Sequence, residues 1–283
     1  MKKSLLLRLP DIVAHGHRQA SHFLASLEDR QRIAWHPRQR ALSAHGAAHT
    51  PDHSDHPSSD HRDHLVCGDD LAVLAALLAG HPGLPRLRGR VGLICFDPGP
   101  DAPAARAGSA AQADKERLTG LTLRLLLMRA LLADTGFIRV RLGQDPAGCA
   151  RLVVDTVFGS ENCAQDILWH TPPSPRMASA ALRHGMVHVY AKHRRRVEPV
   201  LPGPTVPWGP SSSPAEAMLR HLLAVSTAPG DTVVAFNAGA EIAAVAAPSA
   251  RQWVITAPDT PACDTLHQRL SARGARPFLR QAV

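Results

Sequence analysis

The chain has 283 residues, of which 45% are hydrophobic and 20% are charged, and its mean hydropathy is -0.11. This balance excludes a wholly disordered chain and provides enough apolar residues for one large α/β domain or two small ones. The most apolar stretch, residues 121–132, is too short to span a bilayer and contains Arg124 and Arg129. A polytopic membrane protein is therefore excluded. The N-terminal apolar run is too short for a signal peptide, so we expect a cytoplasmic protein.

The net charge is +8 at pH 7, from 32 lysines and arginines against 24 acidic residues. Such a basic balance favours a polyanionic partner, nucleic acid first, although a GC-rich genome also enriches arginine. The five cysteines are odd in number, and no two of them are spaced as C-x-x-C. This usage predicts reduced thiols rather than a disulfide framework.

Residues 1–63 differ from the rest of the chain in composition. Ten of the 17 histidines lie between His15 and His64, and a polar run without periodicity ends this region. We predict a flexible, histidine-rich arm over residues 1–63, with one short helix at residues 19–34. The polar run could also ligate a divalent metal, but such tracts bind metal opportunistically, so no dedicated metal site is predicted. The side chains of that alternative are His49, Asp52, His53, Asp55, His56, Asp60, His61, Asp63 and His64.

Apolar strands and helices alternate from residue 65 onward, which predicts an α/β fold with a mostly parallel, doubly wound sheet. In chain order, the predicted elements are a strand at 65–67, a helix at 69–79, a strand at 91–96, a helix at 118–133, a strand at 137–142, a helix at 149–158, a strand at 185–192, a helix at 214–226, a strand at 232–236, a helix at 240–247 and a strand at 252–256.

Ligands bind open α/β sheets at the carboxyl ends of the strands. Three predicted strand ends carry turns suited to ligand contact, at Gly68-Asp69, at residues 97–100 and at residues 235–239. Both aspartates also have a local explanation. Asp69 could cap the helix that follows it, and Asp97 could cap a turn.

The segments around these turns occur in a recognisable order. They are LVCGDDLAVLAALL, RVGLICFDPGP, LRLLLMRALLADTGFIRVRL, VFGSENCAQDILWH, HVYAKH and PGDTVVAFNAGAEIAAVAAPSARQWVI. In this order they resemble the β-class of S-adenosylmethionine-dependent DNA amino-methyltransferases, the N6-adenine enzymes of type III and type II modification systems. In that class the catalytic motif precedes the cofactor motif. The resemblance implies a Rossmann-like methyltransferase domain over residues 64–283.

The resemblance implies a catalytic position with an altered motif. Asp97 and Pro98 stand where the family has the Asp-Pro of Asp-Pro-Pro-Tyr, whose acceptors hold the exocyclic amine of the flipped base. Gly99 and Pro100 replace the second proline and the tyrosine. The ring that stacks on the base is therefore absent, and such stacking is worth about 1–3 kcal/mol per base. Arginines also stand in the predicted strand at 137–142, at positions 139 and 141, where the family has uncharged residues.

The implied cofactor site is similarly altered. Gly68, Asp69, Phe236 and Gly239 stand at the cofactor-binding positions of the family. The departures are Ala235 for the motif acid, Glu241 for the last glycine and Ala257 for the acid that holds the ribose. The missing acids would have accepted hydrogen bonds from the cofactor as charged groups, and such hydrogen bonds are among the stronger ones. We therefore expect S-adenosylmethionine binding to be weak or lost.

The arginine run Arg194, Arg195 and Arg196 is the predicted nucleic-acid contact, with a solvated basic turn as the alternative. The family places a target-recognition insert between the predicted strand at 185–192 and the predicted helix at 214–226. In this chain that insert is cut to about twenty residues. We predict a catalytically impaired homologue that binds DNA or serves as a partner subunit, with an intact methyltransferase paralogue as one candidate partner. The alternatives are an active DNA adenine methyltransferase with drifted motifs and an unrelated nucleotide-binding α/β protein.

Overall fold

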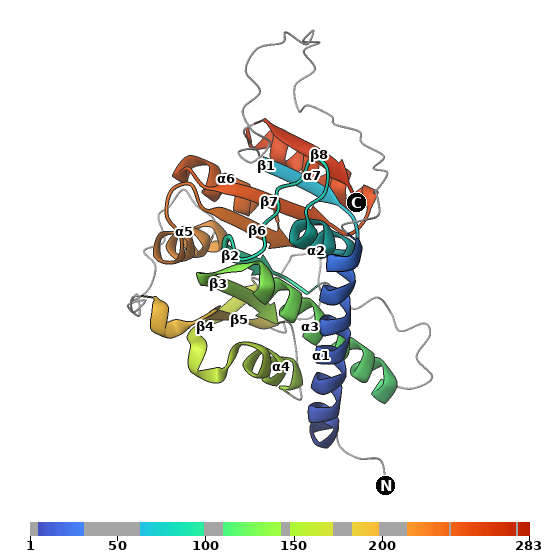
Figure 1. The fold of residues 1–283 in the computed structure, drawn as a ribbon. Helices are drawn as coiled ribbons and strands as arrows, with labels where there is room; N and C mark the ends of the chain where they lie inside the picture. The colour runs from blue at the N-terminus through green and yellow to red at the C-terminus, as the bar shows by residue number, and fades with distance from the viewer. Residues whose placement is uncertain are drawn as a thin grey trace.

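The structure is a computed structural model that describes residues 5–30, 63–98, 110–142, 148–171, 183–197, 214–237, 239–275 and 277–283. One eight-stranded sheet runs through the molecule, with helices on both faces (Figure 1). The strands are β1 (Asp63–Cys67), β2 (Val91–Phe96), β3 (Leu132–Leu142), β4 (Cys163–Thr171), β5 (Arg183–Ala191), β6 (Thr232–Phe236), β7 (Gln252–Ala257) and β8 (Phe278–Ala282). The helices are α1 (Leu5–Arg30), α2 (Asp70–Ala79), α3 (Ala110–Leu131), α4 (Cys149–Phe158), α5 (Pro214–Ser226), α6 (Glu241–Ala246) and α7 (Thr260–Ala272).

The strand order is β4-β5-β3-β2-β6-β7-β1-β8. Neighbouring strands from β3 to β8 are parallel, whereas β5 runs antiparallel to both β3 and β4. The central strand β2 is buried along its whole length, as expected for a strand covered on both faces. The predicted α/β fold with a mostly parallel, doubly wound sheet is confirmed.

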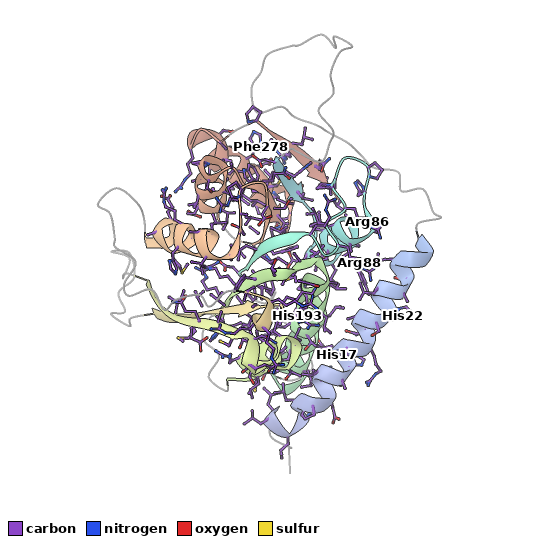
Figure 2. All side chains as sticks on the ribbon, turned by 60° about the vertical axis from the view of Figure 1, so that its left-hand side comes forward. His17, His22, Arg86, Arg88, His193 and Phe278 are labelled. Atoms are coloured by element: carbon purple, nitrogen blue, oxygen red, sulfur yellow. A yellow bond between two sulfur atoms is a disulfide. The ribbon has the colours of Figure 1, made fainter. Side chains whose placement is uncertain are left out.

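Two apolar cores lie on the two faces of the sheet. The first core contains buried residues of α1, α2, α3 and α4, and the second contains those of α5, α6 and α7. Alternate residues of each strand enter opposite cores, so Val234 and Phe236 of β6 join the first and Val233 and Ala235 join the second. Figure 2 shows the side chains that fill these layers, among them Phe278, whose ring lies 5.4 Å from that of Trp253.

The predicted flexible arm is wrong for residues 5–30. They form the 26-residue helix α1, which begins earlier than the expected helix at 19–34 and packs on α3. Its apolar positions enter the first core, and Gly16 lets the two helices approach, because a Cβ there would lie 2.6 Å from Thr122 Cβ. His17 and His22 are exposed on this helix (Figure 2).

Asp63 and His64 do not belong to a connector either. Both are buried in β1, where Asp63 Oδ1 accepts a hydrogen bond from the Trp253 backbone amide at 3.0 Å. The rest of the polar histidine run lies outside the described residues. Within the described part of the chain, no group of three or more potential metal-ligating side chains is gathered, and no helix there is long and apolar enough to cross a membrane.

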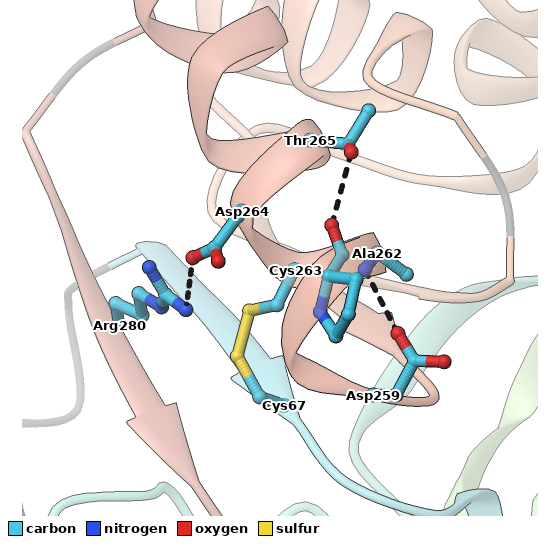
Figure 3. The surroundings of a disulfide bond; sticks show 8 residues. Cys67, Asp259, Ala262, Cys263, Asp264, Thr265 and Arg280 are labelled. Atoms are coloured by element: carbon cyan, nitrogen blue, oxygen red, sulfur yellow. Dashed lines mark hydrogen bonds and ion pairs between the residues drawn. A yellow bond between two sulfur atoms is a disulfide. The ribbon is translucent and has the colours of Figure 1, made fainter.

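The expectation that all cysteines are free is wrong for one pair. Cys67 at the end of β1 and Cys263 in α7 form a disulfide, with 5.8 Å between their Cα atoms (Figure 3). The other three, Cys95, Cys149 and Cys163, are not disulfide-bonded. The two bonded cysteines are 196 residues apart, so local spacing carries no signal of their pairing. They meet because β1 lies beside β7, and α7 packs back over both strands.

Candidate functional site

The predicted catalytic and cofactor turns lie side by side at the carboxyl edge of the sheet. Their strands β2 and β6 are neighbours, and Phe96 pairs with Phe236. Asp97 follows β2, and its backbone amide donates to the Phe236 carbonyl at 3.1 Å. Pro98 follows Asp97, while Gly99 and Pro100 lie outside the described residues. The strand order thus brings together two motifs that are about 140 residues apart in the chain.

Two arginines of β3 hold the Asp97 carboxylate. Arg139 Nη1 donates to Asp97 Oδ1 at 3.0 Å, and Arg141 Nε lies 3.3 Å from Asp97 Oδ2. Residues 139 and 141 alternate along the strand and therefore present their side chains on the same face. The Arg139 side chain is 7% exposed and that of Asp97 is 14% exposed, so this contact is largely shielded from water. Each oxygen of the predicted catalytic carboxylate already has a cationic partner.

A cavity of about 370 Å³ opens beside Asp97. Its polar lining is Asp97, Arg139, Arg141, Asn237, Glu241 and Arg269, and its apolar lining is Met218, Leu219 and Ile242. Gly239 also lines it, and the Glu241 carboxylate occupies the space that a Cβ on Gly239 would fill. Arg269 Nη2 holds this carboxylate at 3.1 Å, and Arg273 Nη2 lies 3.7 Å away. Glu241 therefore covers the glycine turn, at the position where the family has its last glycine.

The turn after β1 is joined to the turn after β6. Asp69 is exposed and caps α2, because its carboxylate accepts from the Leu71 amide at 2.9 Å. Asp70 is buried, and it accepts from Asn237 Nδ2 at 3.1 Å and lies 3.4 Å from Arg124 Nε. Burial raises the pKa of the Asp70 carboxyl above its ordinary value, with Arg124 acting in the opposite direction. The Asn237 contact bridges the two turns between which the family binds its cofactor.

The remaining cofactor positions contribute little polar chemistry. Phe236 is fully buried in the first core, so only its backbone faces the turns. Ala235 and Ala257, which stand at the positions of two family acids, are also fully buried. Gly68 donates its amide to the Ala257 carbonyl at 2.9 Å, and a Cβ on Gly68 would lie 2.8 Å from the carbonyl oxygen of Val283.

Comparison with known proteins agrees with this architecture. No protein-family model matches the chain. A putative DNA modification methylase from Thermus thermophilus, TTHA0409, superposes with a TM-score of 0.53 and 16% identity over 78% of this chain and 99% of its own. The cytosine-N4-specific PvuII DNA methyltransferase superposes with a TM-score of 0.51 and 16% identity over 75% of this chain and 86% of its own. The fold is that of a DNA methyltransferase.

A sequence relative points in the same direction. The Mod subunit of the type III restriction-modification enzyme EcoP15I from Escherichia coli is 26% identical over 80 residues. This match spans 28% of the present chain and only 12% of the Mod subunit. The resemblance to DNA methyltransferases expected from the sequence is confirmed.

The arginine run lies at the opposite edge of the sheet from Asp97. Because β5 is antiparallel to β3, the run that follows β5 lies near the start of β3, whereas Asp97 lies at the carboxyl edge. Arg194 donates to the Cys163 carbonyl at 3.1 Å, and Arg196 forms an ion pair with Asp134. Arg195 is exposed. The structure therefore does not bring the predicted nucleic-acid contact to the predicted catalytic position.

A polar network that the sequence did not suggest ties α4 to β4 and β5. Arg151 Nη1 lies 2.7 Å from Asp166 Oδ1, and His188 Nδ1 lies 2.7 Å from the same oxygen. Tyr190 donates its hydroxyl to Asp155 at 2.5 Å. His188 is buried. The network lies in the layer of α4, on the face opposite the second core, and its groups satisfy one another, which indicates a structural role.

Proposed function

We propose that the chain is a catalytically impaired homologue of the DNA N6-adenine methyltransferases, acting in the cytoplasm as a DNA-binding or partner subunit of a modification system. The observation that carries this proposal is the double ion pair of Asp97 with Arg139 and Arg141. An amine that attacks a methyl group develops positive charge, which a free carboxylate stabilises at close range. Two guanidinium groups on the same carboxylate counteract that stabilisation and take one acceptor position on each oxygen.

The surroundings of the glycine turn support weak or absent binding of S-adenosylmethionine. The solved structures that resemble the chain include TTHA0409 in complex with S-adenosyl-L-methionine. In this chain, however, Glu241 covers Gly239, and the Asn237 to Asp70 hydrogen bond joins the flanking turns. No acid stands at residues 235 and 257. The residues present therefore do not fit this cofactor, and no reaction step is assigned to it.

DNA is the partner that fits both the fold and the net charge of +8. An intact methyltransferase paralogue in the same modification system would supply the missing chemistry. The match to a Mod subunit supports this arrangement, because that protein is named as one subunit of a larger enzyme.

The decisive experiment measures transfer of labelled methyl groups from S-adenosylmethionine to mixed-sequence DNA. The wild-type chain and the Asp97→Ala variant are expected to give the same background signal. Calorimetric titration with S-adenosylmethionine is expected to show no binding in the micromolar range. Turnover by the wild-type chain that Asp97→Ala abolishes would instead establish an active methyltransferase.

A further inference from the structure

We infer that the cavity beside Asp97 is a binding site for a phosphate monoester. The inference concerns a small-molecule ligand, and it holds whether or not the chain binds DNA. Three arginines line this cavity, Arg139, Arg141 and Arg269, against two carboxylates, Asp97 and Glu241. The lining therefore carries one net positive charge, contributed by guanidinium groups, which bind phosphate oxygens in a bidentate manner.

The arginines retain donors that the two carboxylates do not use. Each guanidinium has five N–H donors in a fixed planar arrangement. Arg139 is largely buried, and its Nε has no surface open to the cavity, so this arginine contributes mainly its positive charge. For Arg141, whose side chain is 46% exposed, the only contact within the described part of the chain is that of Nε with Asp97. Arg269, 50% exposed, contacts Glu241 through Nη2. A phosphate monoester brings three strong acceptor oxygens and a charge near -2, which matches this surplus.

The size and the apolar wall of the cavity define the rest of the ligand. A volume of about 370 Å³ suits a small molecule and not an extended strand of nucleic acid. Met218, Leu219 and Ile242 form an apolar wall in the same cavity as the arginines. This combination suits a phosphate that carries a flat, largely apolar group, as a nucleoside monophosphate does. A sulfonium cation is disfavoured by the same charges.

The test titrates the whole 283-residue chain with three probes. Binding is measured by calorimetry and by the shift in melting temperature. The probes are adenosine 5′-monophosphate, inorganic phosphate and uncharged adenosine. We expect the monophosphate to bind and to raise the melting temperature, and adenosine to do neither at the same concentration. Inorganic phosphate is expected to bind more weakly than the monophosphate, because it makes no contact with the apolar wall. Equal binding of phosphate and monophosphate would overturn the monoester assignment and identify a simple phosphate site.

Variants assign the binding to this cavity. Arg141→Ala and Arg269→Ala are each expected to weaken monophosphate binding at least tenfold, because each removes a charge-assisted hydrogen bond. Arg141→Lys should restore only part of the affinity, since lysine keeps the charge without the planar pair of donors. The matched control is Arg195→Ala at the opposite edge of the sheet, which should leave the affinity unchanged.

Two further results would overturn the inference. One is the absence of binding by either phosphate probe at millimolar concentration. The other is an equal loss of affinity in Arg195→Ala and Arg141→Ala, which would indicate a general charge effect. Neither result bears on the methyl-transfer assay, so the phosphate site and the proposed impairment can fail separately.

Discussion

The contact between Asp97 and Arg139 converts a predicted catalytic carboxylate into one half of a shielded ion pair. Removing Arg139 leaves the shielded Asp97 carboxylate with the half-exposed Arg141 as its remaining cationic partner, whereas removing both members of the shielded pair costs far less. We predict that Arg139→Met lowers the free energy of unfolding by about 3 kcal/mol. Combining it with Asp97→Asn should recover most of this loss. Urea unfolding of the two single variants and the double variant measures the coupling, and strictly additive losses would show that the pair does not interact.

The Asp166 carboxylate makes a contribution to stability that depends on pH. Partial burial raises the pKa of its carboxyl, but hydrogen bonds from Arg151 and His188 outweigh burial, so the pKa lies below its ordinary value of 3.8. Its stabilising contribution is therefore complete above pH 3.8 and is lost as the pH falls through the lower folded-state pKa. We expect Asp166→Asn to melt below the wild type near neutral pH, with the gap closing under more acid conditions. Melting curves across this range measure the gap, and a gap that widens on acidification would contradict the sign.

The residues of the site differ in how far the sequence alone could locate them. Asp97, Asp69 and Gly239 follow recognisable strands, so their positions at the carboxyl edge could be predicted. Arg139 and Arg141 stood out as departures from the family, but their contact with Asp97 depends on β3 lying beside β2. Glu241 finds its partner Arg269 at a distance of 28 residues, through the packing of α7. Contacts of this kind arise from strand order and helix placement, which local patterns do not encode.

At the scale of elements, the contact between α1 and α3 is tight enough to test with a single methyl group. Gly16→Ala would place a Cβ 2.6 Å from Thr122 Cβ, which forces the helices apart. We expect a loss of about 1–3 kcal/mol in unfolding free energy, as for other overpacked positions. Gly120→Ala in α3 is the matched control, because its nearest neighbour is the flexible end of Arg124 at 3.1 Å. That change should stabilise by about 0.5–1 kcal/mol, and equal effects of the two would contradict the packing argument.

The disulfide between β1 and α7 predicts a definite thiol count. In denatured protein prepared without reductant, three thiols should react with Ellman's reagent. After reduction, five thiols should react. In the native chain Cys95 should remain unreactive, because burial raises the pKa of its thiol to about 11. Five reactive thiols without reduction would show that Cys67 and Cys263 are not bonded. Serine at both positions is the control that isolates the bond's effect on melting temperature.

The elements that the sequence missed share a physical cause. The predicted strands β2 and β6 are continuous apolar runs, α2 is apolar along nearly its whole length, and α5 carries apolar residues at helical spacing. By contrast, β8 reads FLRQA and is held by its pairing with β1 and by the ion pair of Arg280 with Asp264 (Figure 3). Similarly, α1 lies in a histidine-rich region whose composition suggested a connector, and it is buried mainly against α3, with further contacts to α4 and α2. Elements stabilised mainly by distant partners are the ones that local patterns fail to show.

At the scale of the whole molecule, the two edges of the sheet carry separable functions under the proposals made above. DNA bound through the arginine run should respond to salt, because each neutralised phosphate releases counterions. We expect Arg195→Ala to weaken DNA binding. It should also make the slope of log K against log salt less negative by about 0.9. Arg141→Ala should leave that slope unchanged. Fluorescence anisotropy with mixed-sequence duplex at several salt concentrations measures both slopes, and a larger change for Arg141→Ala would place the DNA at the carboxyl edge instead.

The packing of α1 also sets an order of events during synthesis. This helix leaves the ribosome before α3, its main partner, which begins only at residue 110. Its apolar face, with Leu9, Ile12 and Val13, therefore lacks most of its native contacts until a large part of the chain has followed. Such non-local contacts form late and leave apolar surface exposed in the meantime. Nascent chains that stall before α3 is complete should consequently depend on chaperones, or aggregate through a helix that is synthesised long before its main partner.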